Sequence, residues 1–401
     1  MSSTAVPWKL PLTGRDPEEG HRASTPLELL FDLAFVVAVA AAAAALHHDL
    51  SEGQFDGLVG YAMTFFAIWW SWLNYSWFAS AYDTGDVVFR LMTFVILTGV
   101  LVLAAGIPFV IRDDPDFTIV VVGYLIMRAA LVPMWLRVAK DHPRVRGVAL
   151  RYVVGITLVQ ALWVGRLWVH DDTWSVLSFV VLALFELAIP YVAETSGSES
   201  TPWHVEHIVE RFQLFTIIVL GEVILATTQA ISATLDGHGI SADLSMVIAG
   251  GLLLVLSMWW VYFKRPLVDC IHGRNGFLFG YAHYFLLGAV AAVGAALAAN
   301  VDLVQHEAHG ITARQAVLCL AVAVAVYLLA LGSIHAFGDG DLATLVSPAV
   351  LSTLVFVAAI IATEESDHVG PGVLVVGLVL TGAVVDHQAR AKRPSREPAP
   401  R

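Results

Sequence analysis

The chain has 401 residues, of which 58% are hydrophobic and only 14% are charged. A soluble protein of this length carries about 25% charged residues, so the composition excludes a water-soluble domain as the main body of the chain. The formal net charge of -12 argues against nucleic acid as a partner. Almost every stretch of about 20 residues between polar breaks is apolar enough to span a bilayer, which predicts an all-α polytopic membrane protein in contact with lipid.

Twelve membrane-spanning helices are predicted, six on each side of a polar linker. Residues 1–25 form a hydrophilic N-terminal segment, and residues 389–401 form a basic tail. The first six-helix half is predicted at 26–193, the linker at 194–204 and the second half at 205–388. The predicted spans are 26–46, 57–80, 88–110, 117–139, 148–169, 174–193, 208–231, 244–263, 277–299, 314–337, 342–362 and 370–387.

Positive charges orient the chain in the membrane. With twelve spans, 18 of the 22 Lys and Arg residues fall on one side. Only Arg112, Arg166 and Arg314 fall on the other side, and Arg128 lies in the middle of a span. Because cytoplasmic loops retain Lys and Arg, we predict a cell (inner) membrane protein with both termini in the cytoplasm.

The two halves resemble weak internal repeats. The second helix of each half carries a Trp pair, at 69–70 and at 259–260, and glycines recur in the third helices at Gly99 and Gly288. Because each half has an even number of spans, the halves are predicted to be parallel repeats related by an axis along the membrane normal.

Charged side chains within the bilayer are costly, so they are the default candidates for function. Glu28 and Asp32 lie four residues apart, hence on one face of the first predicted helix, near its inner end. Glu28 follows a helix-start pattern, Ser24-Thr25-Pro26, so capping of the helix is an equal alternative for that residue. Asp32 lies one turn deeper, where the helix dipole has less effect, and a functional role is favoured.

The seventh predicted helix carries Glu210 and Arg211 at its inner end. Glu222 follows about 18 Å further along this helix, near the middle of the membrane. Arg128 of the fourth span is the obvious partner of Glu222, and Glu186 of the sixth span is a rival partner for the arginine. A transport pathway and a structural ion pair both remain open for these residues.

The predicted inner loop after the second span contains Asp83, Asp86 and Arg90. Paired aspartates hold divalent ions in membrane prenyl-transfer enzymes, but those enzymes need a second acidic cluster. The corresponding place in the second half has only Asp269 among basic residues. Helix capping with a salt bridge to Arg90 is therefore favoured, and no metal site is predicted.

His283 lies within a span, where a packing role with satisfied hydrogen bonds is favoured over a proton relay. The chain contains no phosphate-binding glycine loop, no dinucleotide-binding fingerprint and no serine-nucleophile elbow. We therefore predict no cofactor and no catalytic residue.

Four segments carry recognisable motifs, at 27–37, 82–91, 135–142 and 210–222. Together they resemble the bacterial low temperature requirement A (LtrA) family, over residues 25 to about 385. The resemblance implies a bacterial inner-membrane protein that is linked by name to growth in the cold, and it implies no settled activity. The chain departs from the family pattern at Gly85, where a second acid is expected beside Asp86.

A remoter similarity concerns the potassium channels built from two six-helix repeats, which carry a Phe-Ser-Asp motif in the first helix of each repeat. Phe31-Asp32 is similar to that motif, and the layout of two six-helix halves agrees with it. The second half departs, because Gln213 or Leu214 stands where the aspartate belongs.

These observations favour a channel or secondary transporter for a small cation or other small solute, with Asp32 and Glu222 lining the path. The alternative is an intramembrane enzyme acting on a lipid or isoprenoid, with Asp83, Asp86 and His207 near the inner interface. A membrane sensor or scaffold is a third interpretation. Assembly as a homo-oligomer is compatible with each of the three.

Overall fold

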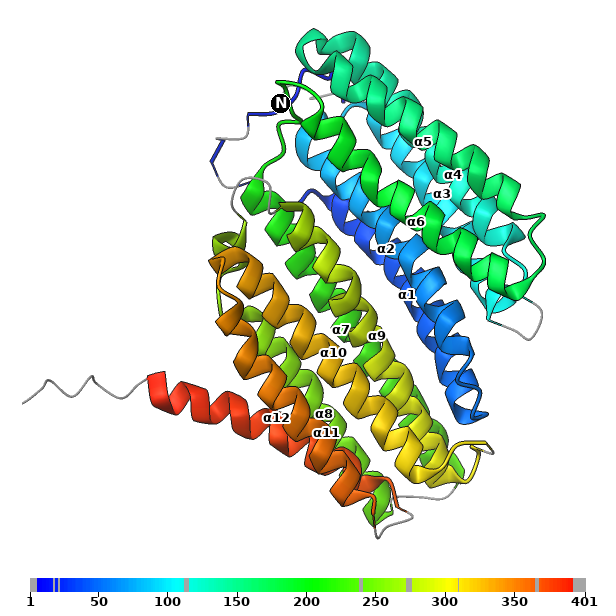
Figure 1. The fold of residues 1–401 in the computed structure, drawn as a ribbon, viewed down its shortest axis with the longest axis vertical. Coiled ribbons are helices and arrows are strands. Elements are labelled where there is room, and N and C mark those ends of the chain that lie inside the picture. Colours follow the sequence, from blue (N-terminus) through cyan, green and yellow to red (C-terminus); the bar gives the residue numbers. More distant parts are fainter. Residues whose placement is uncertain are drawn as a thin grey trace, which may run out of the picture. The chain divides into compact units, whose positions relative to one another are not determined.

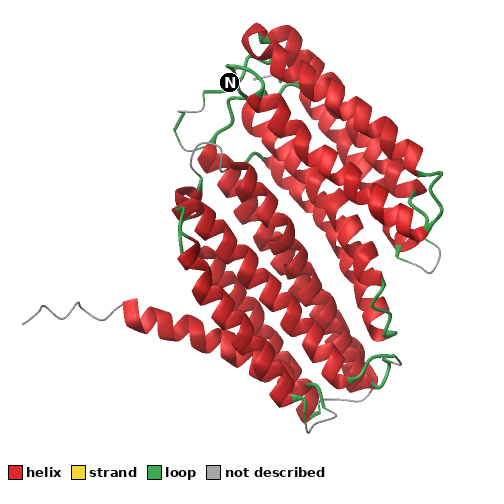
Figure 2. Ribbon diagram, in the orientation of Figure 1, coloured by secondary structure: helices red, strands yellow, loops and turns green. Residues whose placement is uncertain are grey.

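The computed structural model describes residues 6–16, 19–20, 22–111, 115–237, 241–271, 276–308, 310–364 and 368–391. Over these residues the chain folds into twelve α-helices and no strand (Figure 2). The prediction of an all-α polytopic membrane protein is therefore confirmed. The helices are α1 Pro26–Ser51, α2 Gly57–Tyr82, α3 Val87–Val110, α4 Thr118–Asp141, α5 Arg146–Arg166, α6 Asp172–Thr195, α7 Val205–Gly237, α8 Ala242–Phe263, α9 Gly276–Gln305, α10 Ala313–Asp339, α11 Val346–Ala362 and α12 Gly370–Ala391.

Polar caps place the starts of several helices. The side chains of Asp171, Ser241 and Thr312 each accept a hydrogen bond from the backbone amide three residues further on, at 3.0 to 3.3 Å. An amide in the first turn has no partner within the helix, so each cap satisfies a donor that would otherwise face the headgroup region unpaired. These caps explain why α6, α8 and α10 begin one or two residues before the predicted spans.

Ten helical segments among the described residues are long and apolar enough to cross a membrane. The apolar part of α12, Gly370–Asp386, is shorter, and α2 is the other exception. α2 is rich in Trp, Tyr and Ser, and most of its residues are buried inside the protein. A helix that is shielded from lipid in this way does not need a uniformly apolar surface.

The chain divides into two compact units. The first unit comprises Met1–Leu46 and Asp56–Val219, and the second comprises His47–Phe55 and Leu220–Arg401. α7 therefore begins in the first unit and ends in the second. The residues of the candidate site described below all belong to the first unit, apart from Glu222 and His283.

The same order of neighbours recurs in the two units. α3 packs on α4, α4 on α5 and α5 on α6 in the first unit, and α9 to α12 pack in the corresponding sequence in the second (Figure 1). α8 also packs closely on α12, where a Cβ added to Gly250 would lie 2.5 Å from the carbonyl oxygen of Val373. Between α2 and α6, large rings fill the equivalent place, as in the Phe66–Phe179 contact with ring centroids 5.8 Å apart. Duplication of the halves stays a prediction.

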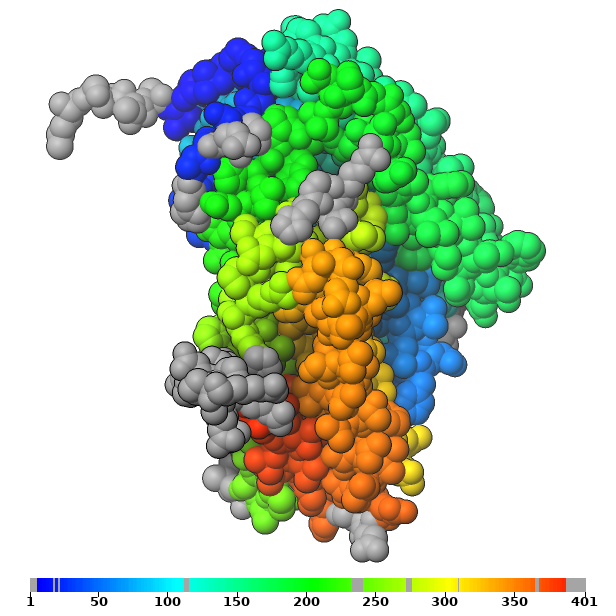
Figure 3. Space-filling view, turned by 60° about the vertical axis from the view of Figure 1, so that its left-hand side comes forward, coloured from blue at the N-terminus to red at the C-terminus, as the bar shows by residue number. Residues whose placement is uncertain are grey.

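Apolar side chains cover the outer surface of the helices. α11, drawn in orange, lies on the surface of the second unit (Figure 3). On this helix Leu354 and Ile361 are 53% and 65% exposed. A soluble protein would not present such a continuous apolar helix face, whereas contact with the lipid bilayer stabilises it.

The closest helix contact in the first unit depends on glycine. A Cβ added to Gly123 of α4 would lie 2.4 Å from the amide nitrogen of Leu103 and 2.6 Å from the carbonyl oxygen of Gly99, both on α3. Both neighbours are backbone atoms, so neither can rotate away. Small residues permit this approach and the dispersion contacts that hold membrane helices together.

We expect Gly123→Ala to lower the free energy of unfolding by about 1–3 kcal/mol, because the methyl group must push α3 and α4 apart. Unfolding of the purified protein by denaturant in detergent measures this. The matched control is Gly165→Ala in the last turn of α5, where an added Cβ has no atom within 4 Å. Equal stability of Gly123→Ala and the wild type would contradict the close packing of α3 on α4.

Candidate functional site

The start of α1 combines a helix cap with a buried acid. The backbone amide of Thr25 donates to Glu28 Oε2 at 2.8 Å, and the amide of Glu28 donates to Thr25 Oγ1 at 3.3 Å. This reciprocal pair is a capping box, as expected for a Thr-x-x-Glu sequence. The other carboxylate oxygen of Glu28 faces charged groups of other elements, so the residue caps the helix and also takes part in buried ion pairs.

Asp32 lies one turn beyond Glu28 and is completely buried. Its Oδ1 atom accepts a hydrogen bond from Trp72 Nε1 of α2 at 2.7 Å and another from Arg211 Nη2 of α7 at 2.5 Å. The guanidinium of Arg211 also donates to Ser76 Oγ at 3.3 Å. Asp32 thus joins three helices through one carboxylate oxygen.

Arg211 bridges the two acids of α1. Its Nη1 atom lies 3.3 Å from Glu28 Oε1, and it is fully buried. The rings of Phe212 and Phe215 pack against the ring of Trp72, with centroids 4.9 and 4.5 Å apart. These aromatic contacts exclude water from the ion pairs and so strengthen their electrostatic attraction.

The row of charges continues to the loop after α2. Arg22, from the segment before α1, lies 3.5 Å from Glu28 and 3.6 Å from Asp83, and it donates to the carbonyl oxygen of Ser80 at 2.9 Å. Burial, together with the nearby charge of Glu28, raises the pKa of Asp83. Burial also lowers the pKa of Arg22. A neutral form is therefore easier to reach for Asp83 than for a free aspartate.

We call the row of side chains Asp83, Arg22, Glu28, Arg211 and Asp32, together with His207, the charge cluster. His207 Nε2 lies 3.2 Å from Glu28 Oε1. Each member is at most 8% exposed. Three carboxylates face two guanidiniums, so the net charge is negative by one unit when all three carboxylates are ionised and His207 is neutral.

Several polar atoms of the charge cluster lack a hydrogen bond within the part of the chain that the structure describes. Asp32 Oδ2, Arg211 Nε and His207 Nδ1 are buried and have no such partner. Asp32 Oδ2 is an acceptor, Arg211 Nε is a donor only, and the role of His207 Nδ1 depends on its tautomer, whereas buried polar atoms are normally satisfied.

A second buried carboxylate is fully satisfied. Glu186 of α6 accepts hydrogen bonds from Tyr124 Oη at 2.7 Å, Trp70 Nε1 at 2.8 Å and Trp163 Nε1 at 3.2 Å. Arg128 Nη2 lies 3.5 Å from Glu186 Oε2. The structure thus pairs Arg128 with Glu186, the rival partner, and not with the expected Glu222. Four donors around one carboxylate match a structural clamp.

The remaining intramembrane candidates are Glu210, which belongs to the first unit, and Glu222 and His283, which belong to the second. Glu210 Oε1 accepts a hydrogen bond from the amide of Ser24 at 3.2 Å. Glu222 is half-buried on the part of α7 that belongs to the second unit. His283 bonds the carbonyl oxygen of Phe279 at 2.7 Å and Tyr262 Oη at 3.1 Å, so both of its ring nitrogens have partners.

The loop after α2 uses its two aspartates differently. Asp83 Oδ1 accepts from the amide of Gly85, whereas Asp86 caps α3 by accepting from the amide of Phe89, both at 2.7 Å. Capping was expected, but the ion pair differs: Asp86 pairs with Arg137 of α4, and Arg90 donates to the carbonyl oxygen of Gly85. Arg137 is 51 residues from Asp86 in the sequence, so the local spacing of residues does not predict this pair.

The amide of Leu10 also donates to Asp86, at 2.8 Å. Burial acts to raise the pKa of Asp86, but the bonds from Arg137, Leu10 and Phe89 outweigh it and lower the pKa to about 2. The loop therefore anchors both α4 and the N-terminal segment through a charged carboxylate.

Sequence reasoning missed two members of the charge cluster and one of its donors. Arg22 lies in a hydrophilic segment, where a solvated side chain is the default expectation. His207 was assigned to the enzyme interpretation alone, and Trp72 lies in an aromatic-rich stretch of the second predicted span, which is typical of an interfacial belt and of helix packing. The one usable signal was the spacing of His207 and Arg211, four residues apart and hence on the same helix face as each other.

Loss of the central guanidinium has a large expected cost. We expect Arg211→Gln to lower the free energy of unfolding by about 3–5 kcal/mol, because it leaves two buried carboxylates without their shared partner. Adding Asp32→Asn to Arg211→Gln is expected to restore part of the loss. The control is Arg265→Gln, which removes a surface pair with Asp339 and is expected to cost far less, because solvent screens exposed ion pairs. Equal losses for Arg211→Gln and Arg265→Gln in denaturant unfolding contradict the buried pairing.

The contribution of Asp86 depends on pH. Its pKa is lower in the folded protein than in the unfolded chain, so the charged form stabilises the fold above about pH 4. That stability, about 1–2 kcal/mol, is lost as the pH falls from about 4 toward 2. We expect the difference in unfolding free energy between wild type and Asp86→Asn to shrink across this window. A difference that is constant with pH argues against a charged, hydrogen-bonded Asp86.

Comparison with known proteins agrees with the motifs. The sequence model of the family described as bacterial low temperature requirement A protein (LtrA) matches residues 23–383. A curated protein of Rhizobium meliloti (strain 1021), described as uncharacterized, is 26% identical over 292 residues, which cover 68% of this chain and 68% of that protein. No solved structure matches the chain significantly. The chain is a multi-pass membrane protein that belongs to the bacterial low temperature requirement A (LtrA) family.

Proposed function

We propose that this protein is a carrier that moves a small cation, protons included, across the cell membrane, and that the charge cluster binds the cation. The observation that carries the proposal is the excess of one carboxylate in a site where each side chain is at most 8% exposed. The termini and Asp83 are taken to face the cytoplasm, as the distribution of Lys and Arg predicts.

Electrostatics gives the charge cluster a reason to bind a cation. An unpaired charge buried away from water costs several kcal/mol. A proton or a small cation near Asp32 Oδ2 reduces that cost, because this atom is buried without a hydrogen bond within the described residues. Glu28 Oε1, in contrast, already faces Arg22, His207 and Arg211. Asp83 lies at the end of the row, and its raised pKa means that it binds a proton more readily than a free aspartate does. In this proposal Asp83 is the group that exchanges protons with water.

Binding at this site would also change which helices are held together. Neutralising Asp32 weakens its ion pair with Arg211, and that pair ties α1 to α7. A ligand shifts a conformational equilibrium when it binds the two states with different affinity. Occupancy of the cluster therefore couples to the packing of these two helices, which is what a carrier requires.

A carrier agrees with the geometry better than a continuously open channel. Oδ1 of Asp32 is occupied by Trp72 and Arg211, so an ion moving along this face has to displace a guanidinium. Fast conduction needs sites that bind ions weakly and leave their oxygens free. Phe31-Asp32 is similar to the potassium-channel motif, but Asp32 is bound by Trp72 and Arg211 and is not free to contact a passing ion.

The enzyme interpretation gains no support from the arrangement of the acids. Asp83 accepts a hydrogen bond from Gly85 and faces Arg22. Asp86 caps α3, pairs with Arg137 and accepts a hydrogen bond from the N-terminal segment. A diphosphate-binding pair needs carboxylates that converge on one metal ion. His207 pairs with Glu28, and no hydrogen bond or ion pair joins it to Asp83 or Asp86 within the described residues.

The test is ion flux into proteoliposomes, measured in turn for potassium, sodium and protons. We expect a saturable flux of at least one of these cations, and a decrease of at least about tenfold in Asp32→Asn, because the variant removes the excess negative charge. Glu222→Gln tests whether the path continues along α7. The matched control is Asp56→Asn, an exposed acid at the start of α2 whose side chain makes no capping bond.

Two outcomes contradict the proposal. The first is the absence of flux for all three cations, with folding and insertion verified. The second is a flux that Asp32→Asn leaves unchanged relative to Asp56→Asn. A flux that does not saturate and is lost in Asp32→Asn favours a channel through the same site.

A further inference from the structure

The N-terminal segment lies across the end of α2 and the start of α3. The first-turn amides of Val87 and Val88 in α3 donate to carbonyl oxygens of this segment at 3.0 and 3.2 Å. The amide of Arg15 donates to the carbonyl oxygen of Ala81, in the last turn of α2, at 2.9 Å. Backbone groups at helix ends lack a partner within the helix, so the segment satisfies groups of both helices.

Side-chain packing holds the same segment, and we call residues 7–16 the strap. Leu12 is completely buried, and its amide donates to Asp141 Oδ2 at 3.2 Å. Gly14 has a φ of 85°, and a Cβ at this position would lie 2.8 Å from Cγ of Pro202. Only glycine adopts this conformation readily and leaves room for the proline ring. The strap is therefore a packed element of the first unit.

Arg22 follows the strap and stands at the end of the charge cluster. Its Nη1 atom donates to the carbonyl oxygen of Ser80 at 2.9 Å. Its Nη2 atom lies 3.5 Å from Glu28 and 3.6 Å from Asp83, and it has no hydrogen bond within the described residues. The guanidinium thus compensates two carboxylates without a hydrogen bond to either.

Arg22 differs in this respect from Arg137, which belongs to the same unit. The guanidinium of Arg137 donates directly to Asp86 and to the carbonyl oxygen of Leu10, so it anchors the strap. Charge-assisted hydrogen bonds of this kind are roughly twice as strong as neutral ones. Because Arg22 lacks such a bond to a carboxylate, it is the easier of the two arginines to displace.

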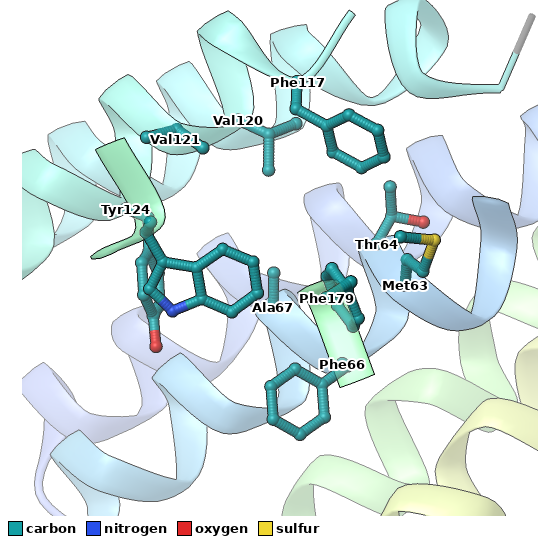
Figure 4. Close-up of a pocket in the computed structure, with 10 residues that line it drawn as sticks. Met63, Thr64, Phe66, Ala67, Phe117, Val120, Val121, Tyr124 and Phe179 are labelled. Carbon is teal, nitrogen blue, oxygen red and sulfur yellow. The ribbon is translucent and has the colours of Figure 1, made fainter. Parts of the chain in front are cut away.

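Access to the charge cluster depends on the groups around Asp83. This residue is 6% exposed, and besides its ion pair with Arg22 its carbonyl oxygen accepts from Arg15 at 3.3 Å. The apolar pocket between α2, α4, α5 and α6 offers a cation no other entrance. Aromatic side chains such as Phe66 and Phe117 line it, and its volume of about 20 Å³ holds one water molecule (Figure 4).

We propose that Arg22 is a plug that closes the cytoplasmic end of the charge cluster, and that the strap tethers it there. Its guanidinium competes with the transported cation for Glu28 and Asp83. A tethered group competes at a high effective concentration, so the plug keeps the site closed until the cation is abundant. The inference rests on the proposed function for the identity of the competing cation, but the closure itself is measurable without transport.

The first test measures access to the cluster. Ser80 is completely buried and its carbonyl oxygen binds Arg22, so Ser80→Cys places a thiol beside the plug. The full chain in nanodiscs reacts with a cationic methanethiosulfonate reagent, and mass spectrometry of peptides gives the rate at each thiol. We expect reaction at position 80 to become at least about tenfold faster when Arg22→Gln or Leu12→Ala is added, because each variant raises the population of the open state.

The matched control is Lys9→Gln, which removes an exposed positive charge from the strap. Cys270 and Cys319 stay in place, and unchanged rates at these thiols show that the variants remain folded. An unchanged rate at position 80 in Arg22→Gln or in Leu12→Ala overturns the proposal. Equal acceleration by Lys9→Gln also overturns it, because the effect is then one of general charge.

The second test is the flux assay in proteoliposomes. We expect Arg22→Gln to lower the half-saturating cation concentration at least about tenfold, since it removes the competitor and leaves three carboxylates facing one guanidinium. A partly unfolded variant does not produce such a gain. Saturation at the same concentration in Arg22→Gln and wild type overturns the plug. Absence of flux in every variant contradicts the proposed function alone, and the labelling rates still decide whether Arg22 closes the cluster.

Discussion

The first unit depends on one buried guanidinium. Arg211 lies between Glu28 and Asp32, and the three side chains are fully buried. None of these charges is tolerable alone in an apolar interior, so the positions of α1 and α7 are mutually required. Trp72 adds α2 to the same contact by donating to Asp32. The capping box at Glu28 then sets where α1 begins relative to the charges.

Three buried charge sites in the first unit illustrate three degrees of compensation. Four groups donate to Glu186, and one of them is its counter-ion Arg128. Protonation of Glu186 would therefore bring little gain in free energy. The charge cluster has counter-ions but one carboxylate in excess. Arg166 has backbone and hydroxyl partners but no acid within the described residues. The degree of compensation separates a clamp from charges that have fewer partners within the described residues.

The N-terminal segment is part of the first unit. Arg22 supplies one of the two guanidiniums of the charge cluster, and the amide of Leu10 donates to Asp86. In contrast, the second unit is held together largely by apolar and small residues, as at Gly250 and Gly377 between α8 and α12. Helices in a membrane are not driven together by the hydrophobic effect, so small residues that allow close packing are favoured at their contacts. The concentration of charge in one unit therefore marks where chemistry is expected.

The class of fold, the twelve helices to within a few residues at most ends, and the shared face of Glu28 and Asp32 could all be predicted from the amino-acid sequence. These properties are local: they follow from apolar length, polar caps and the helical repeat. Tertiary structure alone decided which charges meet. Arg211 and Asp32 are 179 residues apart, and Arg128 had two candidate acids at similar predicted depth. Depth in the membrane creates the need for a partner, but only helix packing selects which partner lies within reach.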